Sequence, residues 1–367
     1  MGQREKAPEI QALYDKGAQV YSYSKLGTIH DCPYNAYLTY IEKRPTLDNV
    51  YSYMGTICHD TLEGIIEGKN TEKDIAPAIE DGLEELGMLG MEFPKTRDGK
   101  DGIRDKWVAN MRCMARDYVS PKGEFDVEKL LILKIREDRY LQGYADLIRK
   151  LPDGRVQVLD IKTSSQFQDK DLLHYGRQLV AYTMALEQAG YKVVPMPAWL
   201  MIKYVQVQYR AKRTLRSKVE EDFVKVCDRC KLGYVIKGVV RNKMKAAGYE
   251  SDVIEDTLQR FYESNDMRDL PADIASQFRV TTYVRPYKVT DELREECLNY
   301  INETADKFEE MQVSGEWPPK EVTDKNGNPD FFCTNLCGHH KDCEYLRDAI
   351  NKSTFYKAKE MDLDELF

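Results

Sequence analysis

Two strands joined by a tight turn, with acidic residues near one end, constrain this chain more than any other part of it. A strand expected over residues 141–150 is followed by a Pro-Asp-Gly-Arg turn and a second strand over 156–161. Alternation puts Asp160 and Lys162 on one face of the sheet, and the hairpin brings Asp146 alongside Asp160. Carboxylates are costly to pack together, so the pattern predicts a divalent cation between them.

Paired carboxylates of this kind suit phosphodiester hydrolysis. Magnesium prefers oxygen ligands, and a bound cation acidifies a water molecule and offsets charge growing on the phosphate. Lys162 would orient that water or hold the scissile phosphate. An Asp-x-Lys tripeptide alone is more often part of an ordinary surface salt bridge, so the interpretation depends on the surrounding residues.

Two further pairs of residues have helical spacing. Gln178 and Tyr182 are four residues apart and share one helix face, as do His59 and Glu63 in a helix expected over 53–68. Taken alone, Gln178 and Tyr182 would be solvated or half-buried, and His59 would be a structural histidine.

The combined spacing resembles the PD-(D/E)XK nuclease superfamily, in its RecB/AddB-type iron–sulfur exonuclease branch, which includes the CRISPR adaptation exonucleases. That branch has a Gly-x-x-x-His-x-x-Leu-Glu helix, a Gly-x-x-Asp strand, an Asp-x-Lys strand and a Gln-x-x-x-Tyr helix. The matching residues here are Gly55, His59, Leu62, Glu63, Gly143, Asp146, Asp160, Lys162, Gln178 and Tyr182. One departure is Ala145, which stands where the superfamily's name records a proline.

The resemblance implies an α/β fold with a central mixed β-sheet flanked by helices, a restriction-endonuclease-like nuclease core. It implies that Mg²⁺ or Mn²⁺ is held by His59, Asp146, Asp160 and the backbone carbonyl of Ile161. It also implies that Glu63 sits close to the metal, that Lys162 activates water, and that Gln178 and Tyr182 position the DNA strand.

Three of the nine cysteines, Cys333, Cys337 and Cys343, lie close together in the sequence. A fourth ligand could be a histidine among them, His339 or His340, which would give a structural zinc site. It could instead be Cys32, which would give four thiolates suited to a [4Fe-4S] cluster. The resemblance favours the cluster, although the spacing of three then five residues departs from the branch's two then five. Either centre would join the termini and stabilise the fold.

Four parts are expected along the chain. Residues 1–211 form the nuclease core, and 212–276 form a helical insertion with helix-period apolar residues such as Phe223 and Val226. Residues 277–345 contain a return strand, a long helix and the C-terminal cluster cysteines, and 346–367 form an acidic tail. Within the insertion, Cys227 and Cys230 are expected on one helix face.

Composition limits the partners. A net charge of −8 argues against a generally basic nucleic-acid coat, but it leaves room for a local basic groove. We expect a stretch from Lys203 to Lys218 to be a solvated face.

No stretch approaches the ~20 apolar residues of a membrane helix and no secretion signal is visible, so we expect a cytoplasmic protein of a bacterial, archaeal or phage-infected cell. The partners expected are DNA and a helicase, recombination or sliding-clamp protein, bound through the insertion or through the tail at 361–367.

These features predict a metal-dependent DNA nuclease, an exonuclease acting on single strands or DNA ends in recombination, repair, replication or phage DNA processing. A DNA-binding or scaffold protein with a vestigial site is one alternative, but such proteins lose the acids or the lysine, and both acids and Lys162 are present here. A zinc-stabilised interaction module is the other alternative.

Overall fold

A computed structural model describes residues 7–96, 99–212 and 219–353 of the chain. At its centre is a mixed sheet in which β1, β3, β4, β5 and β6 are neighbours in that order, with β2 also paired to β3 and β7 to β5. β1 is parallel to β3 and β4 is parallel to β5, whereas the other pairs are antiparallel. The strands are β1 (Gln19–Ser22), β2 (Glu124–Arg136), β3 (Arg139–Lys150), β4 (Val156–Lys162), β5 (Ala198–Lys212), β6 (Glu220–Asp228) and β7 (Phe278–Pro286).

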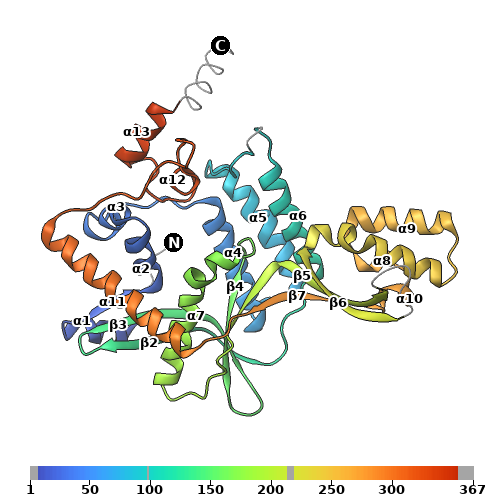
Figure 1. Ribbon diagram of the computed structural model, residues 1–367, viewed down its shortest axis with the longest axis horizontal. Helices are drawn as coiled ribbons and strands as arrows, with labels where there is room; N and C mark the ends of the chain where they lie inside the picture. Colours follow the sequence, from blue (N-terminus) through green and yellow to red (C-terminus); the bar gives the residue numbers. More distant parts are fainter. Residues whose placement is uncertain (1–6, 97–98, 213–218, 354–367) are drawn as a thin grey trace.

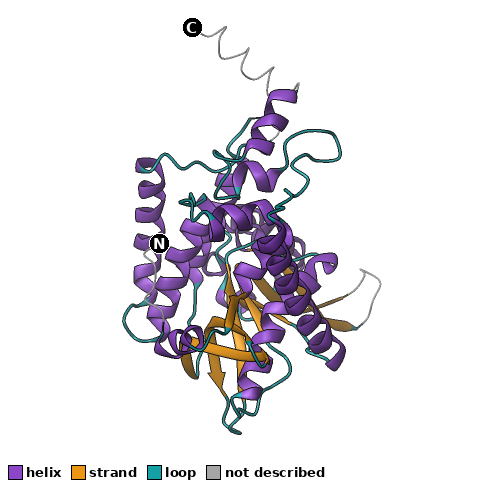
Figure 2. Cartoon of the chain, turned by 90° about the vertical axis from the view of Figure 1, so that its left-hand side faces the viewer, coloured by secondary structure: helices purple, strands orange, loops and turns teal. Residues whose placement is uncertain are grey.

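Helices cover both faces of this sheet (Figure 1, Figure 2). The α-helices are α1 (Pro8–Asp15), α2 (Tyr23–Asp31), α3 (Pro33–Ala36), α4 (Val50–Ile66), α5 (Ile75–Met88), α6 (Gly102–Asp117), α7 (Leu172–Gln188), α8 (Leu232–Ala246), α9 (Ser251–Ser264), α10 (Ala272–Ala275), α11 (Asp291–Ser314), α12 (Phe331–Asn335) and α13 (Glu344–Lys352). Shorter π- and 3₁₀-helical turns are η1 (Tyr37–Ile41), η2 (Glu72–Asp74), η3 (Asp169–Asp171), η4 (Arg229–Lys231) and η5 (Met267–Asp269).

Two apolar cores lie between the sheet and the helices, one on each face of the sheet. Buried residues of α2, α7 and α11 pack against one face of the sheet, and those of α4, α5 and α6 pack against the other. Along β4, Val156 and Val158 face the α7 side while Leu159 and Ile161 face the α4 side, as the alternation predicts. The predicted α/β architecture with a mixed, helix-flanked sheet is therefore confirmed.

The hairpin of β3 and β4 is also confirmed, with a register that runs from Leu147 opposite Leu159 to Lys150 opposite Val156. On its other side β4 pairs in parallel with β5, where Asp160 lies opposite Trp199. The acidic end of β4 therefore lies in the middle of the sheet, where its pairing with β5 fixes its position.

The segment 212–276 differs from the predicted run of helices, because it contains strand β6 as well as α8, α9 and α10. Phe223 and Val226 belong to β6, and Cys227 and Cys230 lie in that strand and the η4 turn after it, so the prediction of one shared helix face is wrong. Most of β6 is exposed, and an exposed edge strand lacks the strict alternation that would mark it in the sequence. The helices of the segment have their own buried core, seen as a lobe on the right of Figure 1.

The first and last described parts of the chain come together where the hydroxyl of Tyr34 in α3 donates to Glu344 of α13 at 3.3 Å. The side chain of Ser22 caps α2 by accepting the Lys25 N–H at 3.1 Å. The tail residues 361–367, proposed as a docking peptide, lie outside the described residues. Within the described ranges, every helix is too short or too polar to cross a bilayer.

Candidate functional site

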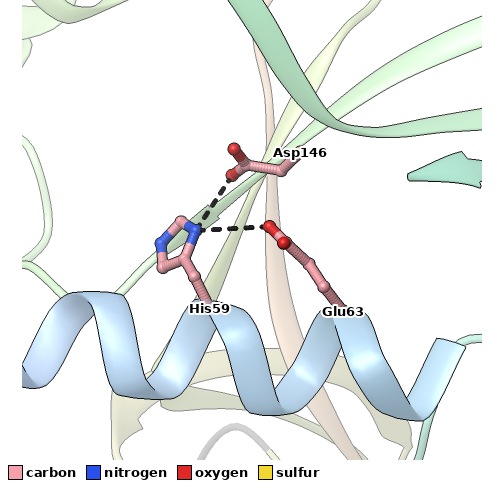
Figure 3. A group of neighbouring side chains, drawn as sticks. All are labelled: His59, Glu63 and Asp146. Atoms are coloured by element: carbon pink, nitrogen blue, oxygen red, sulfur yellow. Dashed lines mark ion pairs between the residues drawn. The ribbon is translucent and has the colours of Figure 1, made fainter. Parts of the chain in front are cut away.

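Three side chains from α4 and β3 meet at the acidic end of the hairpin. Asn49 caps α4 by accepting the N–H groups of Tyr51 and Ser52, and the helix then places His59 and Glu63 one turn apart. The Nδ1 atom of His59 lies 3.5 Å from Asp146 Oδ2 and 3.7 Å from Glu63 Oε1. Figure 3 shows the three side chains pointing toward one another. All three ligand atoms lie within 4.8 Å of one another.

Asp146 reaches this position because β3 and β4 separate at their acidic ends. The paired register stops at Leu147 and Leu159. Beyond it, the N–H of Ile161 donates to Asp146 Oδ2 at 2.7 Å, so a side chain accepts the hydrogen bond that a neighbouring strand would otherwise accept. The carboxylate thus lies between the ends of the two strands, where it contacts His59 of α4.

Asp160 and Lys162 form a second pair beside this group. Asp160 is only 2% exposed, and the Lys162 Nζ atom lies 2.7 Å from its Oδ2. This contact is an ion pair by distance but lacks the angles of a hydrogen bond. The three residues whose ligand atoms converge are His59, Asp146 and Glu63. Asp160, which was expected as a metal ligand, is not among them.

The electrostatics of the site reflect crowded acids. Burial, and then the charge of Asp160, raise the pKa of Asp146 to about 7. Burial alone would lower the pKa of His59, but the carboxylates of Glu63, Asp146 and Asp160 outweigh it and raise that pKa. Burial would likewise lower the pKa of Lys162, yet Asp160 and Asp146 raise it. The site therefore attracts positive charge strongly at neutral pH.

Gln178 and Tyr182 lie on α7 and are bonded to each other, since Gln178 Nε2 donates to Tyr182 Oη at 3.2 Å. Tyr182 is only 5% exposed, and its ring packs on Gly143 of β3. A Cβ atom at position 143 would lie 2.5 Å from Tyr182 Oη, so a glycine is needed for this close approach. Because Tyr182 is buried, it holds Gln178 in place, and Gln178 is the more accessible of the pair.

Lys203 on β5 is buried, contrary to expectation. We expected it on a solvated face, but it is 8% exposed, and burial lowers its pKa to about 8. Burial raises the pKa of Cys58, which precedes His59 on α4, and the positive charge of Lys203 opposes that rise. The register of β5 against β7 shifts between Met201 and Val205, so the alternation along the strand does not indicate which way Lys203 points.

The four cysteines expected in a cluster line a single narrow cavity of about 20 Å³. Cys32 comes from the start of α3, and the others come from α12, the turn after it and the start of α13. Burial raises the pKa of Cys333 to about 12 and also raises the pKa of Cys337, on which the charges of Cys32 and Cys343 act as well. Cys32 and the three later cysteines therefore line one cavity, but among the described residues their sulfur atoms do not form a group that converges within 4.8 Å.

Both histidines of the cluster lie nearby. His339 is 1% exposed, lines the same cavity and pairs its Nε2 with Thr39 Oγ1 at 2.9 Å, whereas its Nδ1 is buried without a hydrogen-bond partner. His340 Nδ1 lies 3.0 Å from the carbonyl oxygen of Cys337. The donor set thus contains four thiols and one imidazole nitrogen that has no partner.

Comparison with known proteins gives one family. A family model described as the PD-(D/E)XK nuclease superfamily matches residues 20–345. No curated protein matches the chain. Among solved structures, the crystal structure of a "Putative exonuclease" from Eubacterium rectale is similar, with 11% identity over 79% of this chain and 93% of that chain. The TM-score of 0.31 is too low for that likeness to support any conclusion about this chain.

Proposed function

The chain belongs to the PD-(D/E)XK nuclease superfamily, and we propose that it is a metal-dependent deoxyribonuclease, an exonuclease that hydrolyses single-stranded DNA or DNA ends. The observation that carries the proposal is the convergence of His59, Glu63 and Asp146 beside the Asp160–Lys162 pair. Imidazole and carboxylates at this spacing are ligands for a divalent cation, and the lysine is placed where such chemistry needs a positive charge.

The side chains present fit Mg²⁺ or Mn²⁺. Glu63 Oε1 is buried and accepts no hydrogen bond, so an ion would supply the partner it lacks. With His59 neutral, three ionised carboxylates and Lys162 sum to −2, which one divalent ion would neutralise. Bonds of about 2.1 Å put neighbouring ligand atoms roughly 3 to 4 Å apart, and the measured separations from His59 Nδ1 are 3.5 and 3.7 Å.

We assign the ion to His59, Glu63 and Asp146, assisted by Asp160 and by the backbone carbonyl of Ile161. A bound ion supplies an acidified water and offsets charge on the phosphate. Asp160 holds Lys162, whose side chain is 25% exposed, so its ammonium group can meet a phosphate oxygen or orient the attacking water from the solvent side.

Gln178 would contact the DNA strand, and Tyr182 would position Gln178 through their hydrogen bond. The exonuclease assignment and a role in recombination, repair, replication or phage DNA processing rest on the resemblance of the motifs to the RecB/AddB-type branch.

A second part of the proposal is an iron–sulfur centre at Cys32, Cys333, Cys337 and Cys343. Support comes from the four thiols that line one cavity and from the branch resemblance. Four thiolates suit a [4Fe-4S] cluster, whereas zinc bound by thiols and His339 is the alternative that the unpartnered Nδ1 atom favours. Iron, sulfide and zinc analysis of anaerobically purified protein separates the two, and brown colour with broad visible absorption is expected for the cluster.

The four-part division of the chain is also a proposal. It is supported by the separate core of α8, α9 and α10, which makes the segment 212–276 a lobe able to bind a helicase or recombination partner. A sliding-clamp partner would bind the tail.

Nuclease activity is tested with end-labelled single- and double-stranded DNA and Mn²⁺. Wild-type protein should release short products from the labelled end, and Asp160→Asn and Lys162→Ala should each lower the rate by about 100-fold or more, the usual contribution of such groups. Lys150→Ala is the matched control, because Lys150 lies on β3 but pairs with Glu124 and Asp126 away from the site. Equal cutting by all four proteins would reject the site, and DNA binding without cutting would favour the vestigial alternative.

A further inference from the structure

A large cavity lies between the sheet and the insertion, beside the metal site and away from the cysteines. Its volume is about 590 Å³, within the range of small-molecule pockets. Its floor is apolar and buried, with Ile202 and Val205 of β5 at 1% and 3% exposure. Val119 and Val284 also line it and are 72% and 42% exposed, so this end opens to solvent.

One cation is buried in the wall of this cavity. Arg229, in the η4 turn, is 4% exposed; its Nε donates to the Ile202 carbonyl at 2.6 Å and its Nη2 donates to Thr282 Oγ1 at 2.7 Å. In the described part of the chain, Nη1 has no hydrogen-bond partner and no carboxylate forms an ion pair with this guanidinium. Burial lowers the pKa of Arg229 to about 10, which leaves it charged at neutral pH.

The nearest acids, Asp117 and Asp266, form their ion pairs with other arginines, although the charge of Asp117 also acts on Arg229. Asp117 lies 2.6 Å from Arg116 and 3.7 Å from Arg268. Asp266 lies 2.6 Å from Arg268 and 3.5 Å from Arg116. These two acids and two arginines sum to zero, so Arg229 adds one positive charge to the group, in which Arg116 lies just outside the cavity lining.

We propose that this cavity binds a small organic anion, whose single negative group pairs with Arg229 and whose apolar part lies against β5. Burying a cation without an anionic partner costs free energy. A ligand carboxylate would accept a charge-assisted hydrogen bond from Arg229, which no carboxylate of the described residues accepts. The apolar floor requires a hydrocarbon or aromatic body, since inorganic anions would leave it unfilled. The proposal does not depend on nuclease activity.

The ligand would sit close to the candidate metal centre. Ile161 and Leu62 both line the cavity, and their neighbours in the sequence are Asp160, Lys162 and Glu63. The same Ile161 donates its N–H to Asp146. This shared wall is a route by which an anion could regulate the metal site.

The test is calorimetric titration with octanoate and with octan-1-ol, which share a chain and differ in charge. Wild-type protein should bind octanoate at least tenfold more tightly than octan-1-ol, because only octanoate pairs with Arg229. Arg229→Met, which keeps an unbranched apolar side chain and removes the charge, should bind the two equally. Arg241→Met is the control, since Arg241 is a surface residue of α8 that pairs with Glu255, and it should keep the wild-type preference.

Two results would overturn the proposal: equal binding of both probes by the wild type, or an unchanged preference in Arg229→Met. If Arg229→Met does not fold, Val284→Trp replaces it, because this change narrows the mouth and leaves Arg229 intact. It should weaken octanoate binding at least fivefold, and unchanged binding would place the anion elsewhere.

Discussion

Three elements hold the carboxylate of Asp146: its own strand β3, the Ile161 N–H of β4 and the His59 ring of α4. A carboxylate in this position is oriented before any ion arrives, so little ordering entropy remains to be lost on metal binding. The cost is that an acid lies buried beside another acid, which is why the pKa of Asp146 rises to about 7.

This raised pKa predicts how metal-free stability depends on pH. An unfolded aspartate has a pKa of about 3.9, so between roughly pH 4 and pH 7 the folded protein binds more protons at Asp146 than the unfolded chain does. The free energy of unfolding therefore falls as pH rises through that window, by at most about 4 kcal/mol. The raised pKa of His59 acts in the same direction, because its contribution is also lost as pH rises.

We expect the melting temperature of metal-free protein to fall from pH 5 to pH 8, and Mn²⁺ to raise it far more at pH 8. Scanning calorimetry with and without Mn²⁺ measures both effects. Asp146→Asn should flatten much of the pH dependence, and an equal Mn²⁺ effect at both pH values would contradict the assignment.

Several site residues could be predicted from spacing, because His59 and Glu63 share a helix face and the hairpin places two acids side by side. Other features depend on tertiary packing, which spacing does not record. The separation of β3 from β4 beyond Leu147, the burial of Glu63 and the inward position of Lys203 are of this kind.

At the scale of elements, the contact between β3 and α7 sets the position of Gln178, and Gly143 makes that contact close enough. Gly143→Ala would put a Cβ atom 2.5 Å from Tyr182 Oη, so the tyrosine must move and Gln178 with it. We expect a loss of about 1 to 3 kcal/mol of stability, as for overpacking of a core, together with reduced nuclease activity.

The control for this substitution is Gly27→Ala in α2, where nothing lies within 4 Å of an added Cβ. It should be neutral or stabilising by up to about 1 kcal/mol. Denaturant unfolding compares the two variants, and equal stabilities would show that Tyr182 does not need the space at position 143.

The long strands and helices could be predicted from the periodicity of their apolar residues, whereas β6 could not. Its apolar residues Phe223 and Val226 are three apart, which looks helical, and most of its other side chains face solvent. β5 extends to Lys212, pairs with β6 over its second half and pairs with β7 from Ala198 to Tyr209, so the lobe is an extension of the central sheet. A pairing of this kind is a non-local contact that a single strand's sequence cannot specify.

For the whole molecule, the cysteine centre would join residues about 300 positions apart. Closing a loop of that length by a cross-link removes on the order of 5 kcal/mol of unfolded-state entropy, an upper limit for a metal-thiolate link. Cys343→Ser should therefore lose the bound metal and lower the melting temperature by several degrees.

Cys230→Ser is the matched control, because Cys230 is a partly exposed thiol outside the cluster. Metal content and melting temperature are measured on the same samples. Wild-type values of both for Cys343→Ser would exclude a centre that includes this thiol. The family resemblance was what favoured Cys32 over a histidine as the fourth ligand, since no local pattern relates Cys32 to the distant trio.

The central claim is that His59, Glu63 and Asp146 hold one divalent ion. Anomalous scattering from crystals grown with Mn²⁺ tests it most directly. The account predicts a manganese peak within bonding distance of His59 Nδ1, Glu63 Oε1 and Asp146 Oδ2, which should disappear in Asp146→Asn. A peak bound elsewhere, or one that persists in that variant at the same position, would contradict it.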